Sequence, residues 1–164
     1  GGQESGKRSG TENVPAIAGF GLAAEMSEHG RRENSASMAQ MRQRLISQLT
    51  ASLDDIVINS PETAGENAGE CCSSLLNISF LGTRGEVLLH TLEQDGIYVS
   101  TGSACSSNKK GQSHVLKAMG LKDKEIEGTL RFSFGRMNSI EEIDIAADKV
   151  AAAVKRFRRL GSFR

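Results

Sequence analysis

The residue best suited to chemistry is Cys105, which stands in a run of small and polar residues from 100 to 112. Lys109 and Lys110 follow it closely, and nearby cations favour the thiolate, which is the nucleophilic form of cysteine. Structural cysteines prefer apolar surroundings, which this run does not offer. The pattern predicts a nucleophilic thiol on a movable loop. The alternative from these residues alone is an incidental surface cysteine.

Arg131 is the second candidate, because it lies between Leu130 and Phe132 in an apolar stretch that is typical of a strand. Burying an unpaired charge is costly, so we expect this guanidinium to have a partner. The partner is either a structural carboxylate or the carboxylate of a substrate held by the guanidinium fork.

A third group of candidates stands just before a predicted helix start at Pro15. Arg8, Gly10 and Thr11 bring a guanidinium, backbone N–H groups and a hydroxyl towards one place. Such a place suits a phosphate or a carboxylate. An ordinary helix-capping loop would explain the same residues.

The overall composition limits the classes of function. The 20 Lys and Arg residues balance the 20 Asp and Glu residues, so the basic excess of a nucleic-acid or acidic-membrane binder is missing. No apolar run approaches the length of a membrane span. Adjacent cysteines bridge only with strain, so Cys71 and Cys72 are interpreted as two thiols without chemistry. The odd count of three cysteines favours a reducing, cytoplasmic setting.

Helical patterns appear at both ends of the chain. One helical stretch follows Pro15, and a second carries an apolar stripe at helical spacing from Met38 to Leu53. A short helix is predicted over 115–119. Near the other end, Ser139 has the spacing of a capping box with Glu142 and opens a strongly amphipathic helix.

Shorter elements lie between these helices. Strands are predicted over 55–59, 75–81, 97–99 and 130–134. Between the second and third, Thr83 and Glu86 also have capping-box spacing, and Gly96 is a typical helix terminator.

The economical architecture for these elements is α+β. We expect a small, mostly antiparallel sheet of three or four strands with helices packed on one face, because each helix has a single apolar stripe. The N-terminal helical stretches would lead into this sheet. The predicted organisation is a connecting segment over 1–33 and a small domain over 34–164 that carries the Cys105 loop.

Four blocks, in this order, resemble one family. They are Gly-Gly-Gln-Glu-x-Gly-x-Arg-Ser-Gly-Thr-Glu-Asn-Val-Pro (1–15), Ser-Thr-Gly-Ser-Ala-Cys-Ser-Ser (100–107), Ser-His-Val-Leu-Lys-Ala-Met-Gly-Leu (113–121) and Leu-Arg-Phe-Ser-Phe-Gly (130–135). Together they resemble the C-terminal portion of a cysteine desulfurase of the NifS/IscS type. These enzymes are class V, fold-type I enzymes that use pyridoxal 5′-phosphate.

The resemblance implies a role for each candidate. Cys105 matches the family's catalytic cysteine, which takes the substrate sulfur as a persulfide while alanine leaves. Arg131 matches the arginine that binds the carboxylate of L-cysteine. Thr11 matches the residue that reaches the cofactor phosphate of the other subunit in a homodimer, and Arg8 and Gly10 belong to the same motif. The resemblance also implies an iron–sulfur scaffold or a tRNA-thiolation protein as the sulfur acceptor.

One departure affects activity. The family's Schiff-base lysine follows a histidine, and no His-Lys pair occurs in these 164 residues, which open on a glycine-rich turn without Met. We therefore expect a piece of a longer protein that is inactive by itself. Two alternatives stay open: a non-enzymatic persulfide carrier that uses only Cys105, and another class V enzyme such as a selenocysteine lyase.

Overall fold

The computed structural model describes residues 1–61, 71–101 and 113–161. The chain divides into two compact units, Gly1–Asn34 and Ser35–Arg164, and each is described by itself. The interpretation of residues 1–33 as a connecting segment and of 34–164 as a small domain stays a prediction.

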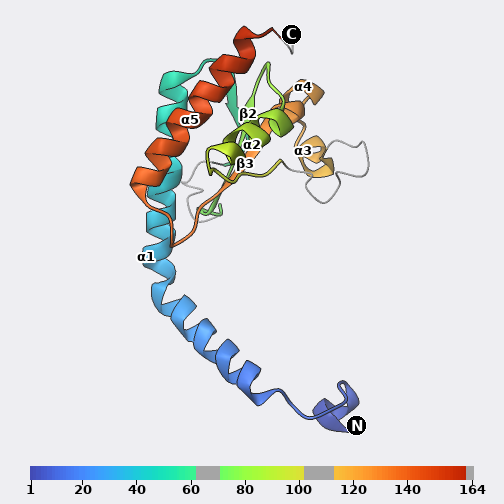
Figure 1. Ribbon diagram of the computed structural model, residues 1–164. Coiled ribbons are helices and arrows are strands. Elements are labelled where there is room, and N and C mark those ends of the chain that lie inside the picture. Colours follow the sequence, from blue (N-terminus) through green and yellow to red (C-terminus); the bar gives the residue numbers. More distant parts are fainter. Residues whose placement is uncertain (62–70, 102–112, 162–164) are drawn as a thin grey trace. The chain divides into compact units, whose positions relative to one another are not determined.

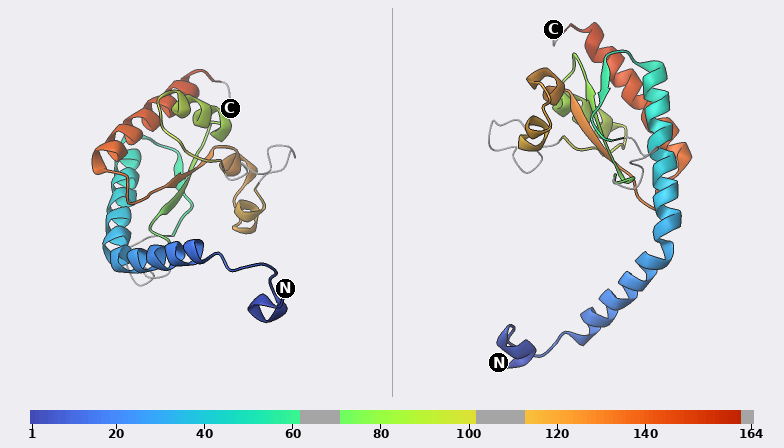
Figure 2. Two further views of the ribbon diagram at one scale, coloured as in Figure 1. Left: turned by 60° about the horizontal axis from the view of Figure 1, so that its bottom comes forward. Right: turned by 180° about the vertical axis from the view of Figure 1, so that it is seen from behind.

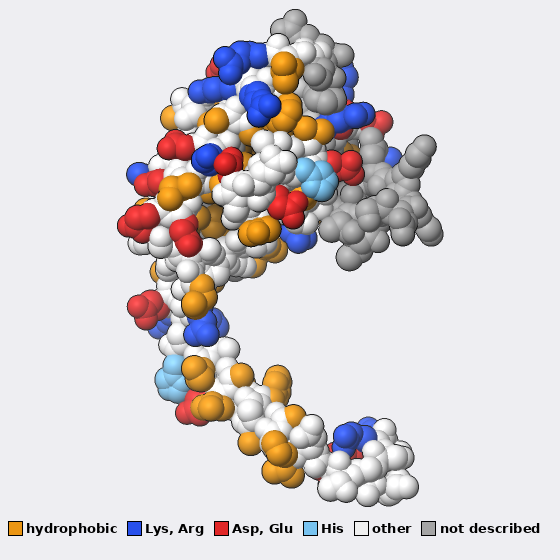
Figure 3. Space-filling model, in the orientation of Figure 1, with side chains coloured by type: hydrophobic (Ala, Val, Ile, Leu, Met, Phe, Trp, Pro, Cys, Tyr) orange, Lys and Arg blue, Asp and Glu red, His pale blue; other side chains and the backbone are white. Residues whose placement is uncertain are grey.

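The first unit contains a short 3₁₀ turn, η1 (Gln3–Gly6), and the beginning of α1 (Val14–Ser52), which continues into the second unit. Two separate helical stretches were expected here, and that expectation is wrong. The polar residues between them contain no proline, and local pairs such as Arg31 with Glu28, 3.0 Å apart, support a continuous helix. Large apolar side chains of this unit are exposed (Figure 3), namely Val14, Ile17, Phe20, Leu22 and Met26.

Within the described residues, the sheet of the second unit has three antiparallel strands in the order β1 (Ile56–Ile58), β2 (Leu75–Phe80), β3 (Thr129–Ser133). The registers pair Ile58 with Ile78 and Ile78 with Leu130. The strand expected over 97–99 is absent from this described part of the chain. Only an isolated bridge forms there, between Ser100 and Arg131.

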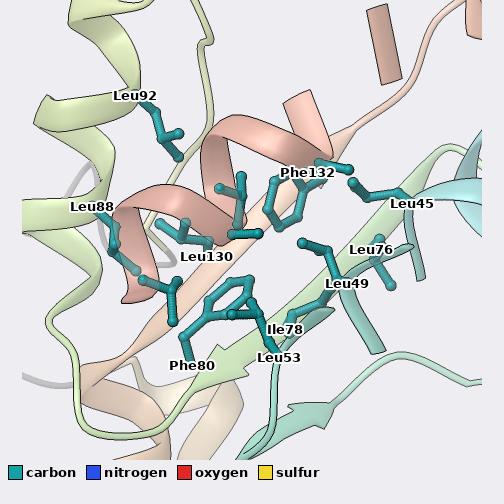
Figure 4. Close-up of a cluster of buried hydrophobic side chains, with 14 of the residues drawn as sticks. Leu45, Leu49, Leu53, Leu76, Ile78, Phe80, Leu88, Leu92, Leu130 and Phe132 are labelled. Atoms are coloured by element: carbon teal, nitrogen blue, oxygen red, sulfur yellow. The ribbon is translucent and has the colours of Figure 1, made fainter. Parts of the chain in front are cut away.

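Three long helices pack on one face of the sheet, as the apolar stripes predicted (Figures 1 and 2). They are the second half of α1, α2 (Gly85–Gln94) and α5 (Ile140–Arg159). Side chains from these helices and from alternate positions of β2 and β3 form one buried cluster (Figure 4), which includes Leu45, Leu49, Leu76, Ile78, Phe80, Leu88, Leu130, Phe132, Val150 and Val154. The α+β architecture is therefore confirmed.

The part of the chain that the structure describes also contains two short helices: α3 (His114–Ala118), which was expected, and α4 (Asp123–Glu127), which was not. Figures 1 and 2 place both on the side of the sheet away from α1 and α5. The second face of the sheet is thus also covered, but by short helices instead of long ones.

The two predicted capping boxes have different outcomes. Ser139 and Glu142 form the reciprocal box at the start of α5, with Glu142 N donating to Ser139 Oγ at 3.3 Å. At the start of α2 the expectation is wrong, because the Thr83 hydroxyl donates to the Phe80 carbonyl oxygen at 2.7 Å instead. Gly96 has a φ of +76°, as expected of a residue that ends a helix.

Candidate functional site

A pocket of about 270 Å³ lies on the sheet face opposite the long helices. Its walls come from residues 59–61, residues 75–77 of β2, Arg131 of β3, and α3 with Ser113 before it. Among the described lining residues none carries a carboxylate, and Arg131 is the one that is charged. The pocket therefore favours an anionic ligand.

Arg131 reaches this face because strand side chains alternate. Its neighbours Leu130 and Phe132 point into the core, whereas Arg131 is exposed. The expectation of a buried charge is therefore wrong, since the apolar neighbours belong to the other face. Among the described residues the guanidinium has no ion pair with a carboxylate, so the structural-carboxylate alternative has no support in this part of the chain.

Two asparagines lie beside Arg131, and their placement was not foreseen. Asn77 of β2 stands directly opposite Arg131 in the strand register. Asn59, just after β1, donates from Nδ2 to Asn77 Oδ1 at 2.8 Å. The alternation of side chains along each strand was the sequence pattern that could have indicated this placement. It puts Asn77 and Arg131 on the same face of the sheet once their strands are paired.

Cys105 lies outside the described residues, as do Lys109 and Lys110. The described residues on either side of that segment are close to Arg131. Ser100 exchanges two backbone hydrogen bonds with Arg131, at 3.1 and 2.6 Å, and Ser113 lines the pocket.

Ser113 and His114 begin the helix that forms one wall. Ser113 is the N-cap of α3, and its Oγ accepts from Leu116 N at 3.4 Å. His114 is the first residue of this helix, which therefore begins one residue before the predicted range of 115–119.

The other candidates belong to the first unit and are described there by themselves. Arg8 and Thr11 are exposed, and Arg8 Nη1 donates to the Thr11 carbonyl oxygen at 3.2 Å. Gly10 has a φ of +91°, a conformation that L side chains rarely adopt. Asn13 rather than Thr11 supports the helix start, since its Oδ1 accepts from Ala16 N at 3.2 Å. The three residues are therefore not needed to cap α1, and their roles stay predictions.

Cys71 and Cys72 are both thiols, in agreement with the sequence interpretation. Cys72 is exposed, and its Sγ lies 3.0 Å from Ser74 Oγ. This hydrogen bond, with a smaller contribution from the charge of Arg42, holds the pKa of the Cys72 thiol below its ordinary value. Cys72 therefore has more thiolate character than was expected.

Replacing Ser74 by alanine should raise the pKa of Cys72 and slow its alkylation by iodoacetamide at pH 7 by a few-fold. The cause is a smaller thiolate fraction, so the difference should vanish at a pH high enough to ionise both forms. Alkylation rates at Cys72, followed by mass spectrometry, measure this. Ser73→Ala is the matched control, because Ser73 Oγ contacts Ser35 Oγ instead. Equal slowing in both variants would contradict the prediction.

Among the described residues, no group of three or more His, Cys, Asp or Glu could hold a metal ion. In the same part of the chain, no helix has both the length and the apolar character required to cross a bilayer.

Known proteins resemble this chain over nearly its whole length. A family model described as aminotransferase class V matches residues 2–145. Cysteine desulfurase IscS of Clostridium botulinum is 36% identical over 160 residues, which are 98% of this chain and 39% of that protein. Cysteine desulfurase IscS 1 of Archaeoglobus fulgidus is 38% identical over 160 residues, or 98% of this chain and 40% of that protein.

A solved structure of a NifS-like protein matches the fold with a TM-score of 0.77 at 33% identity. The match covers 95% of this chain and 38% of that one. The chain therefore spans less than half the length of the relatives that it matches.

Proposed function

The chain belongs to the class V aminotransferase family, and from this membership we propose that it is the C-terminal part of a pyridoxal-phosphate-dependent cysteine desulfurase. The observation that carries the proposal is the placement of Arg131. Among the described residues that line the pocket it is the only charged one and none is a carboxylate, and the described residues on both sides of the Cys105 segment lie beside it. The relatives named cysteine desulfurase support the same reaction.

In the proposed reaction, Arg131 binds the carboxylate of L-cysteine through its guanidinium fork. The Cys105 thiolate attacks the substrate sulfur, so a sulfur–sulfur bond forms as the carbon–sulfur bond of the substrate breaks. The electron pair of the broken bond goes to the substrate carbon, which takes a proton and leaves as part of L-alanine. Cys105 then carries a persulfide, and atoms and charge balance without an external oxidant.

The residues proposed to hold the cofactor phosphate fit an anion. Arg8 lies against Thr11, both are exposed, and Gly10 between them has no side chain to block an approach. In a homodimer they would serve the cofactor of the partner subunit. When bound, the cofactor supplies an electron sink that stabilises negative charge on the substrate.

The proposal includes an incomplete active site in this chain. Because no lysine here follows a histidine, the Schiff-base lysine must come from elsewhere in the enzyme. This chain with L-cysteine and pyridoxal phosphate is therefore expected to produce no sustained alanine. The persulfide would pass to an acceptor protein of iron–sulfur cluster assembly or tRNA thiolation.

Mass spectrometry tests the proposed function directly. The full-length polypeptide containing this segment, with its cofactor, is treated with L-cysteine, quenched with an alkylating agent and digested. One additional sulfur on Cys105 is expected. Cys72 is the internal control, since it is exposed and inclined to ionise, and it should gain none. An unlabelled Cys105 in cofactor-loaded protein would overturn the desulfurase assignment and favour another class V reaction, such as that of a selenocysteine lyase.

A further inference from the structure

Asn77 and Arg131 face each other across β2 and β3, and both line the pocket whose described lining has no carboxylate. Directly opposed residues of an antiparallel pair have Cβ atoms about 4.5–5.5 Å apart. One small anionic group can therefore contact both side chains. Whether Asn77 offers that anion its N–H₂ group or its oxygen decides whether it attracts or repels the ligand.

The orientation of the Asn77 amide follows from a chain of hydrogen bonds on this face of the sheet. The Thr129 hydroxyl donates to the Glu125 carbonyl oxygen at 2.7 Å. A hydroxyl has one proton, so in the contact between Ser79 and Thr129, 3.1 Å long, Ser79 is the donor. Ser79 and Thr129 are both buried, which removes water as a competing partner. Ser79 Oγ has then used its proton, so it accepts from Asn59 Nδ2 at 2.8 Å.

The same chain sets the orientation of the next amide. With Nδ2 of Asn59 turned towards Ser79, its second proton is donated to Asn77 Oδ1 at 2.8 Å. The oxygen of Asn77 is thereby held at Asn59, and its Nδ2 points away from that contact. Among the described residues, Asn77 Nδ2 has no hydrogen-bond partner, so its protons are available to a ligand in the pocket.

We propose that Asn77 is a second substrate-binding residue, which donates an amide N–H to the carboxylate that Arg131 holds, and that Asn59 is its positioning residue. The inference rests on the proposed function for the identity of the substrate. The anionic character of the ligand follows from the described lining of the pocket, which offers a guanidinium and asparagine amides and no carboxylate. Two donors from different strands fix the orientation of a carboxylate better than one fork.

The test uses the cofactor-loaded, full-length enzyme with Asn77→Ala. A hydrogen bond to a charged group contributes enough that its loss should raise the KM for L-cysteine roughly tenfold to a hundredfold. The dissociation constant of L-alanine, followed by cofactor absorbance, should rise by a similar factor. Cysteamine lacks a carboxylate, so its binding should be unchanged.

A second variant keeps the fold while reversing the group offered to the ligand. In Asn77→Asp, one carboxylate oxygen can still accept from Asn59, whereas the other replaces the N–H₂ group with a negative charge. We expect weaker L-alanine binding than in Asn77→Ala. Gln94→Glu adds the same charge on the exposed surface of α2 and should bind L-alanine like the wild type.

Asn59→Ala tests the positioning role. Losses that act through one contact are not additive, so Asn59→Ala combined with Asn77→Ala should bind L-alanine no more weakly than Asn77→Ala alone. Additive losses would overturn the role of Asn59.

The outcomes separate this inference from the function on which it rests. If the wild type turns over L-cysteine and Asn77→Ala leaves both constants unchanged, the inference is wrong and the function stands. If the wild type binds L-alanine without turning over L-cysteine, the desulfurase assignment falls, and weaker L-alanine binding by Asn77→Ala still supports the carboxylate contact. Equal weakening of cysteamine and L-alanine would overturn the inference, because the effect would then not depend on the carboxylate.

Discussion

Replacing Arg131 by alanine in the full-length enzyme should lower kcat/KM for L-cysteine roughly 30-fold to 1,000-fold, mainly through KM. Removing one partner of a close charge pair in a binding site costs about 2–4 kcal/mol, and each 1.4 kcal/mol is tenfold. Steady-state alanine production measures this effect. Cysteamine turnover should change little, because that substrate has no carboxylate for Arg131 to bind.

Two control variants test whether the loss of kcat/KM is specific to the guanidinium group of Arg131. Arg131→Lys keeps the charge and loses the planar fork, so its kcat/KM should lie between the wild type and Arg131→Ala. Arg136→Ala removes an exposed arginine that does not line the pocket, and it should leave kcat/KM unchanged. Similar losses with L-cysteine and cysteamine would contradict a carboxylate-binding role.

Arg131→Ala also separates the enzyme from the persulfide carrier that shares Cys105. A carrier receives sulfur from another protein and has no substrate carboxylate to bind. Its Cys105 would gain a persulfide at the same rate in Arg131→Ala and in the wild type. Slower labelling of Cys105 from L-cysteine in the variant therefore favours the enzyme.

The structure shows which features the sequence could predict and why. Local patterns succeeded where the interaction is local, as in the capping box of Ser139 and Glu142, three residues apart. The same spacing at Thr83 failed because the corner of the fold offers its hydroxyl a tertiary acceptor, the Phe80 carbonyl oxygen. The face of Arg131 was predictable from strand alternation, which places it opposite to Leu130 and Phe132.

The pair of Asn59 and Asn77 illustrates what one sequence cannot give. The two residues are 18 positions apart, and they meet only because β1 and β2 pair in one register. Nothing about either residue alone distinguishes it from a turn or strand asparagine. The hydrogen bond between Asn59 and Asn77 was not predicted, although it lies beside Arg131, which was. Identifying Arg131 in the sequence was therefore sufficient to locate the pocket but not to identify Asn77 as a second hydrogen-bond donor in it.

The second large effect is expected at Gly128, where α4 passes into β3. A Cβ on Gly128 would lie 2.3 Å from the Phe80 carbonyl oxygen and 3.2 Å from that of Thr83. Both obstacles are backbone atoms, so no side chain can rotate to make room. The two segments are also joined by a backbone hydrogen bond here, since Phe80 N donates to the Gly128 carbonyl oxygen at 2.9 Å. Gly128→Ala must therefore push β2 away from the start of β3.

We expect Gly128→Ala to lower the free energy of unfolding by about 3 kcal/mol, at the upper end of the range for overpacking. The midpoint of urea unfolding, at an unchanged slope, measures this loss. Gly135→Ala is the matched control, because its nearest neighbour is Asn138 Oδ1 at 3.8 Å, an ordinary contact. The control should change stability by less than about 0.5 kcal/mol. Equal stability of the two variants would show that the close approach at Gly128 is not required.

Gly128→Ala should also affect the pocket on the other side of the same strands. The displaced backbone lies next to Thr129, whose hydroxyl begins the hydrogen-bond chain that orients Asn77. If β2 and β3 separate at this end, Ser79 no longer reaches Thr129. The hydrogen bonds that orient the amide of Asn77 then no longer have a fixed donor and acceptor order. In full-length enzyme that remains folded, KM for L-cysteine should then rise while Gly135→Ala behaves like the wild type. If Gly128→Ala is destabilised but its KM is unchanged, the hydrogen bonds of Ser79 and Thr129 do not control substrate binding in the pocket.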